Sequence, residues 1–160
     1  MAEFGFALLG SVTSAAAMFD NQIVLAIFLF AATTGVIGMC IPGMLLPLSF
    51  SAGMLLDNWL AVPVVALGAV AGSHLLFLAA RYGMGDALEA RLAGRMERFA
   101  PHLERHGFAY VALLRVIGTP HFLVTLASAA GPLNQRSFAL ATLLGFLPAI
   151  ALTAGAGSAF

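Results

Sequence analysis

Long apolar stretches separated by short polar groups dominate the chain. No charged residue lies between Asn21 and Leu56, where a straight helix would reach about 54 Å against about 30 Å for a membrane's hydrocarbon core. Gly and Pro residues interrupt this stretch between Gly35 and Pro47. Non-helical backbone at membrane depth needs protein or a water-filled cavity around it, because lipid cannot satisfy its polar groups. We therefore predict a re-entrant helical hairpin over about 23–56, with a cavity at its break.

The same pattern divides the rest of the chain. Residues 4–19 are short for a membrane span, so they either cross the bilayer or lie at its surface. The elements expected after the first hairpin are a span over about 61–80, a charged amphipathic loop over 81–106, a second re-entrant hairpin over about 109–130 and a span over about 137–160. Together they make one membrane domain, 1–160.

Composition sets the class of protein. Hydrophobic residues make up 61% of the chain and charged residues 9%, with a mean hydropathy of +1.00, which is typical of an integral membrane protein. The net charge is zero and no lysine occurs, so nothing indicates nucleic-acid binding. The single cysteine, Cys40, excludes an intramolecular disulfide and makes no metal site by itself. We expect no metal and no cofactor.

Arginines set the expected orientation. The first Arg of the chain is Arg81, and the segment from Arg81 to Arg105 contains five arginines, both ends included. Positive residues favour the cytoplasmic side of a membrane, so the loop 81–106 is predicted to be cytoplasmic. The two hairpins then enter the bilayer from opposite sides.

The two halves also resemble each other. Pro42 and Gly53 are as far apart along the chain as Pro120 and Gly131. An offset of 78 residues therefore superposes the first pair on the second. Each half is a broken hairpin followed by a span. Interrupted segments in two halves of opposite topology indicate a transporter binding site near the membrane midplane. The expected fold is thus all-α, with two oppositely oriented re-entrant hairpins, spanning helices and an inverted repeat.

Several short motifs occur in a fixed order along the chain. They are Ile41-Pro42-Gly43, Ala52-Gly53, residues 68–72, 77–83 and 105–115, Ala130-Gly131, Phe138 and residues 145–148. In their order and spacing the chain resembles the DedA or VTT-domain membrane family, also called SNARE-associated Golgi proteins. The resemblance implies opposed re-entrant hairpins and a role in moving lipids across membranes. It also implies a bacterial inner membrane, where members recycle undecaprenyl phosphate or flip phospholipids.

The chain departs from the family pattern at two acidic positions and around Arg115. Family members often carry an acidic residue where this chain has Met44, and an aspartate where it has Ser73. The second-hairpin pattern around Arg115 also differs. Proton coupling through carboxylates, which the resemblance would imply, therefore loses its expected residues.

Arg115 is the sharpest candidate for binding a substrate. A guanidinium in an apolar segment costs about 2.5 kcal/mol or more and is retained for a cavity, a partner or a ligand. The alternative is that Arg115 reaches the cytoplasmic surface. His121 follows the break of the second hairpin, and His74 and Arg81 lie two turns apart on one helix face. His74 is either a proton site or a hydrogen-bonded helix contact.

Four turn residues complete the predicted site, namely Pro42, Gly43, Pro120 and Gly131. The chain carries no protease or hydrolase motif, so we expect that the protein is not an enzyme. The favoured function is a flippase or scramblase for membrane lipids with an anionic phosphate headgroup, such as a phospholipid or a polyprenyl phosphate. The alternatives are a proton-coupled transporter of small solutes or ions, and a non-transporting scaffold that shapes the bilayer. A homo-oligomer is left open.

Overall fold

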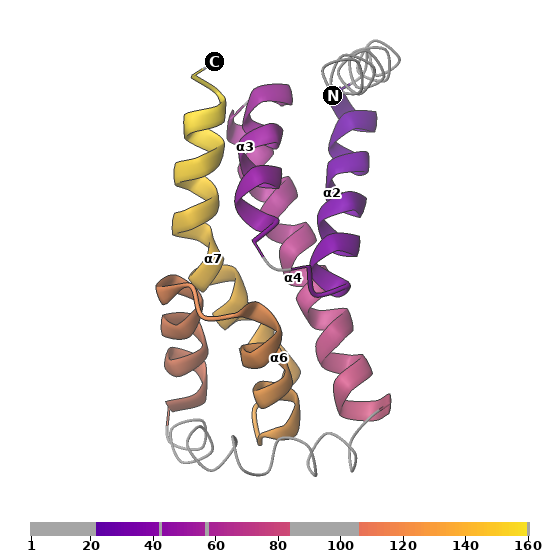
Figure 1. Cartoon of the computed structure of the whole chain (residues 1–160), viewed down its shortest axis with the longest axis vertical. Coiled ribbons are helices and arrows are strands. Elements are labelled where there is room, and N and C mark those ends of the chain that lie inside the picture. The colour runs from indigo at the N-terminus through magenta and orange to yellow at the C-terminus, as the bar shows by residue number, and fades with distance from the viewer. Residues whose placement is uncertain (1–21, 42, 57, 84–105, 160) are drawn as a thin grey trace, which may run out of the picture.

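The computed structural model describes residues 22–41, 43–56, 58–83 and 106–159, and every regular element in these ranges is a helix (Figure 1). The helices are α2 (Gln22–Gly38), α3 (Leu45–Leu55), α4 (Asn58–Gly83), a helix without a label in Figure 1 (His106–Ile117), α6 (His121–Ala130) and α7 (Gln135–Gly157). The predicted all-α class is therefore confirmed. Residues 4–19, and the part of the predicted loop from 84 to 105, lie outside the described residues.

α2 and α3 form a hairpin whose turn contains left-handed backbone. Cys40 has φ 61° and Gly43 has φ 80°, a conformation that glycine adopts without the cost of a Cβ. Pro47 lies in the first turn of α3, where the N–H that proline lacks has no helical partner anyway. Glycine and proline thus end one helix and allow the next to start.

α4 packs against α2 through two small residues, as its glycine spacing predicts. A Cβ at Gly72 would lie 2.5 Å from the backbone oxygen of Thr34, and one at Gly68 would lie 3.0 Å from the backbone oxygen of Phe30. Gly68 thus faces Phe30 and Gly72 faces Thr34, so the residue numbers of the contacting pairs increase in the same direction along both helices. α2 and α4 are therefore parallel (Figure 1). Larger residues at either glycine would separate the helices.

The second half begins with the helix His106–Ile117, which a turn at Gly118, with φ 84°, connects to α6. Asn134 then caps α7, since its side-chain oxygen accepts a hydrogen bond of 2.7 Å from the backbone N–H of Ser137. α7 runs antiparallel to α4 (Figure 1). Pro148 lies inside α7, which continues on both sides of it.

Each short helix packs against the long helix of the other half. α3 lies against α7, where Gly53 leaves room for Ala154 and Gly157 leaves room for the backbone of Phe50. α6 lies against α4. The buried core follows the same division, with one cluster around Val65 and Ile150 and a second around Phe77 and Phe138.

Two helices of the described residues are long and apolar enough to cross a membrane, Trp59–Gly83 within α4 and Gln135–Gly157. Large apolar side chains cover the outside, including Ile27 at 63% exposure and Leu152 at 77%. A soluble surface rarely carries so many. The sequence placed these spans at 61–80 and 137–160. Since α4 continues to Gly83, Arg81, expected to begin the loop, lies in the last turn of the helix.

Candidate functional site

The side chain of Arg115, near the end of the helix His106–Ile117, is buried inside the second half of the molecule, with only 4% of the residue exposed. Its Nη1 lies 2.6 Å from Nδ1 of His121 and donates a longer bond of 3.4 Å to the His121 carbonyl. Its Nη2 donates to the hydroxyl of Thr125 at 2.9 Å. All three partners belong to the first turns of α6, so the guanidinium closes the second hairpin on itself.

Aromatic rings cover the guanidinium on the α7 side. Its central carbon lies 4.7 Å from the ring centre of Phe146 and 5.8 Å from that of Phe138. Such contacts favour a cation, most strongly where water is excluded. Gly145 makes the approach possible, because a Cβ there would overlap Cβ of Arg115.

His121 connects this group to the first hairpin. Its Nε2 lies 3.0 Å from the carbonyl oxygen of Ile37, in the last turn of α2. A guanidinium only donates and a carbonyl only accepts, so Nδ1 must accept and Nε2 must carry the proton. The two contacts therefore require neutral imidazole in one tautomer.

The charge around Arg115 is not balanced within the described residues. All seven Asp and Glu residues of the chain fall outside the described ranges. The charged side chains inside those ranges are Arg81, Arg115 and Arg136, of which Arg115 alone is buried. The partners of Arg115 are neutral groups and rings. An anion would complete the site electrostatically.

Arg81 occupies a different position, between the end of α4 and the end of α6. Its Nε, Nη1 and Nη2 donate to the carbonyl oxygens of Ala129, Leu133 and Gly131 at 3.1, 3.0 and 2.6 Å. Its guanidinium carbon also lies 4.8 Å from the centre of the Phe77 ring. Carbonyls at a helix C-terminus lack helical partners, and Arg81 satisfies those at the end of α6. This contact ties α6 to α4.

The other predicted site residues are distributed along the hairpins. Pro120 precedes His121 as the N-cap of α6, and Gly131 is its C-cap. Gly43 lies in the turn of the first hairpin, and Pro42 lies outside the described residues. His74 lies on α4, where its ring stacks at 6.2 Å on Phe77. The structure thus brings Arg115 and His121 into contact and gives neither of them a direct contact to His74 or Arg81.

Sequence reasoning did not identify Thr125 or Phe146 as parts of this group. Thr125 lies four residues after His121, on the same helix face, and this spacing was a usable signal. Phe146 comes from α7, and nothing in the sequence brings it to Arg115.

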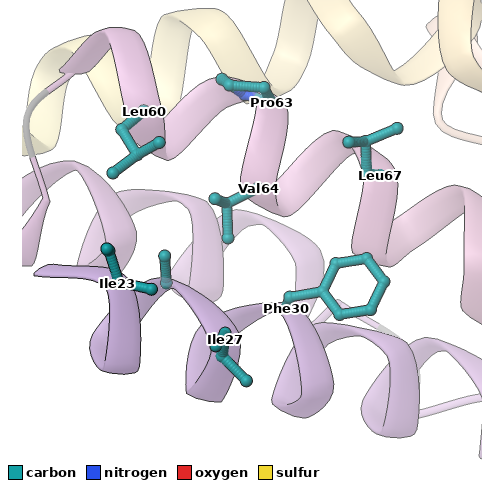
Figure 2. Close-up of a pocket in the computed structure, with 8 residues that line it drawn as sticks. Ile23, Ile27, Phe30, Leu60, Pro63, Val64 and Leu67 are labelled. Atoms are coloured by element: carbon teal, nitrogen blue, oxygen red, sulfur yellow. The ribbon is translucent and has the colours of Figure 1, made fainter.

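A separate groove lies between the first turns of α2 and α4 (Figure 2). It has a volume of about 420 Å³ and is lined by eight apolar residues, Ile23, Ala26, Ile27, Phe30, Leu60, Pro63, Val64 and Leu67. With no polar side chain it offers nothing to bind an anionic group. The chemistry for such a group lies at Arg115.

These features define a helical membrane protein with a buried cation in its second half, next to the contact that His121 makes with the first half. The sequence matches the VTT domain over residues 41–159. The chain therefore belongs to the VTT-domain family, the domain of DedA and SNARE-associated Golgi proteins, which is membrane-associated and often proposed to be transporter-like. No curated protein and no solved structure matches the chain.

Proposed function

We propose that this protein is a flippase or scramblase that moves lipids with an anionic phosphate headgroup across the membrane. The observation that carries the proposal is the buried Arg115 guanidinium, whose partners within the described ranges are all neutral. A planar guanidinium matches a phosphate group in two-point contact. Within a membrane, phosphate groups are supplied by the headgroups of anionic lipids.

The bonds that now hold Arg115 could be exchanged for bonds to a substrate. His121 and Thr125 bind Arg115 through side-chain atoms, and both use neutral atoms to accept from the guanidinium. Hydrogen bonds in which both groups are charged are stronger than those with one neutral partner. A phosphate reaching Arg115 would therefore displace them.

We further propose that the two hairpins are re-entrant and oppositely oriented, related by an inverted repeat. The crossed packing supports this, since α3 lies on α7 and α6 lies on α4. The matching glycines of the repeat each contact the long helix of the other half. Gly53 meets the backbone of α7, and the carbonyl of Gly131 binds Arg81 of α4. Arg115 then lies where the two hairpins meet.

The proposed location is the bacterial inner membrane, with the loop 81–106 in the cytoplasm. A cysteine introduced at Ala90 in a Cys40→Ala background tests this orientation. In intact cells it should react with a membrane-permeant maleimide and not with an impermeant one. Labelling by both reagents would reverse the topology.

Transport itself is tested in proteoliposomes. Fluorescent anionic phospholipid and undecaprenyl phosphate, assayed separately, should cross the membrane with the wild-type protein and not with Arg115→Ala of equal abundance. Crossing that is independent of Arg115 would contradict the role of this residue. Uptake of a solute driven by a pH gradient, without lipid crossing, would favour the proton-coupled alternative. No transport of any kind would favour a bilayer-shaping scaffold.

A further inference from the structure

The buried hydroxyl groups of the helices fall into two sets. Three donate to the backbone carbonyl four residues earlier, as is usual for Ser and Thr within helices; they are Ser49, Thr125 and Ser128. Three others have no hydrogen-bond partner although none of them is exposed, namely Thr33, Ser73 and Thr142. A buried polar group without a partner costs about 1–3 kcal/mol, so these three need an explanation.

Ser73 and Thr142 lie at the same level of the molecule. Phe77 of α4 stacks on Phe138 of α7 with their ring centres 4.6 Å apart. Ser73 precedes Phe77 by one helical turn and Thr142 follows Phe138 by one turn. Because the two helices are antiparallel (Figure 1), both steps lead in the same direction. The two hydroxyl groups are thus brought to one place between α4 and α7.

Arg115 borders the same place. Thr142 lies between Phe138 and Phe146 on one face of α7, and the guanidinium of Arg115 lies over both rings. Nε of Arg115 is buried and has no hydrogen-bond partner either. One buried region is therefore surrounded by three hydrogen-bond donors, two hydroxyls and one guanidinium N–H. None of the three has an acceptor.

Thr33 does not belong to this group. It lies between α2 and α4, where its Cβ would be 3.0 Å from a Cβ at Gly68. Gly68 is more than one helical turn before Ser73.

We propose that Ser73 and Thr142 form, with Nε of Arg115, the inner half of an oxyanion site that binds a phosphate group. This rests on the proposed function of Arg115 and adds two residues to it. The two hydroxyls and the Nε–H donate to phosphate oxygens, while Nη1 and Nη2 bind when they leave His121 and Thr125. A tetrahedral oxyanion accepts several such bonds at once. An uncharged ligand would not satisfy the guanidinium.

The test measures binding of dodecyl phosphate to the purified protein in detergent, with inorganic phosphate and dodecanol as separate probes. Ser73→Ala and Thr142→Val remove the unpartnered hydroxyls with little change in shape. Ser49→Ala and Ser128→Ala are matched controls, since these equally buried hydroxyls bind their own backbone. We expect the two site variants to bind dodecyl phosphate about fivefold to tenfold more weakly than wild type, and the controls to bind within about twofold.

Unliganded stability separates a binding role from a structural one. Removing an unpartnered hydroxyl should leave the thermal midpoint of Thr142→Val unchanged or raise it, so weaker binding would not reflect unfolding. Wild-type affinity in both Ser73→Ala and Thr142→Val, with binding lost in Arg115→Ala, would overturn the inference and leave the proposed function intact. Wild-type affinity in Arg115→Ala would overturn the proposed function itself. Binding of inorganic phosphate as tight as dodecyl phosphate would identify a free anion, instead of a lipid, as the ligand.

Discussion

Arg81 and Arg115 are two guanidinium groups packed against aromatic rings, and they differ in what their donors bind. The three nitrogens of Arg81 all donate to backbone carbonyls in the last turn of α6 and in the turn that follows it, which cannot move away without a change of the backbone. The other nitrogens of Arg115 bind two side chains and, at 3.4 Å, one carbonyl, and its Nε has no hydrogen-bond partner. An arginine with fixed partners holds a structure together, whereas one with exchangeable partners can bind a ligand.

The largest effect is expected for a conservative change at the exchangeable arginine. Arg115→Lys keeps the charge and loses the planar two-point contact. Lipid transport in proteoliposomes should fall at least about tenfold, while the protein is still produced and extracted as a folded species. Transport by Arg115→Lys at the wild-type rate would show that only the charge matters.

A methyl group at Gly145 should act on the same arginine without changing it. In Gly145→Ala the new Cβ would overlap Cβ of Arg115 and lie 2.9 Å from the Ala112 carbonyl oxygen. We expect a loss of stability of about 1–3 kcal/mol from overpacking, together with a loss of most transport. Gly35→Ala is the matched control, since nothing lies within 4 Å of a Cβ there, and it should keep both. Unchanged transport in Gly145→Ala would mean that the position of Arg115 tolerates displacement.

Substitutions of Arg81 should lower stability and leave the transport rate nearly unchanged. Arg81→Lys can replace only part of the three-carbonyl contact, and Arg81→Ala removes it, so the free energy of unfolding should fall by about 2–3 kcal/mol in the alanine variant. The transport rate of the folded protein should stay near wild type. Denaturation in detergent and transport at low temperature measure the two quantities. A loss of transport without a loss of stability would support the substrate-binding role that the sequence predicts for Arg81.

The smallest effect is expected at His121, whose two contacts can be separated. The amide oxygen of His121→Asn can replace Nδ1 toward Arg115, and the amide nitrogen of His121→Gln can replace Nε2 toward Ile37. Each variant should lose about 1 kcal/mol of stability, the value of one hydrogen bond. Transport should change more in His121→Gln than in His121→Asn, because only the former loses its contact with Arg115. The reverse order would assign His121 to the link between the hairpins.

Features that depend on neighbouring residues could be predicted from the sequence, and features that depend on distant residues could not. The glycine and proline breaks near Gly43 and Gly118 could be predicted, because backbone freedom is a property of single residues. The contact between Arg115 and His121 was also within reach, since six residues and one turn separate them. The roles of Ser73 and Thr142 were not, because on its own helix each is an ordinary small polar residue.

The sequence by itself determined that the protein belongs to a membrane, where its helices break and which cation lies in the apolar region, since composition and local backbone preference decide these. Only the tertiary structure decided which donors are used. In the sequence, Arg81 and Arg115 are both arginines next to apolar residues. The packing of α6 against α4 gives Arg81 three carbonyl acceptors. The packing of α7 against α4 leaves Thr142 and Ser73 buried without any. Hydrogen-bond pairing and burial depend on groups distant along the chain, and only the folded molecule brings them together.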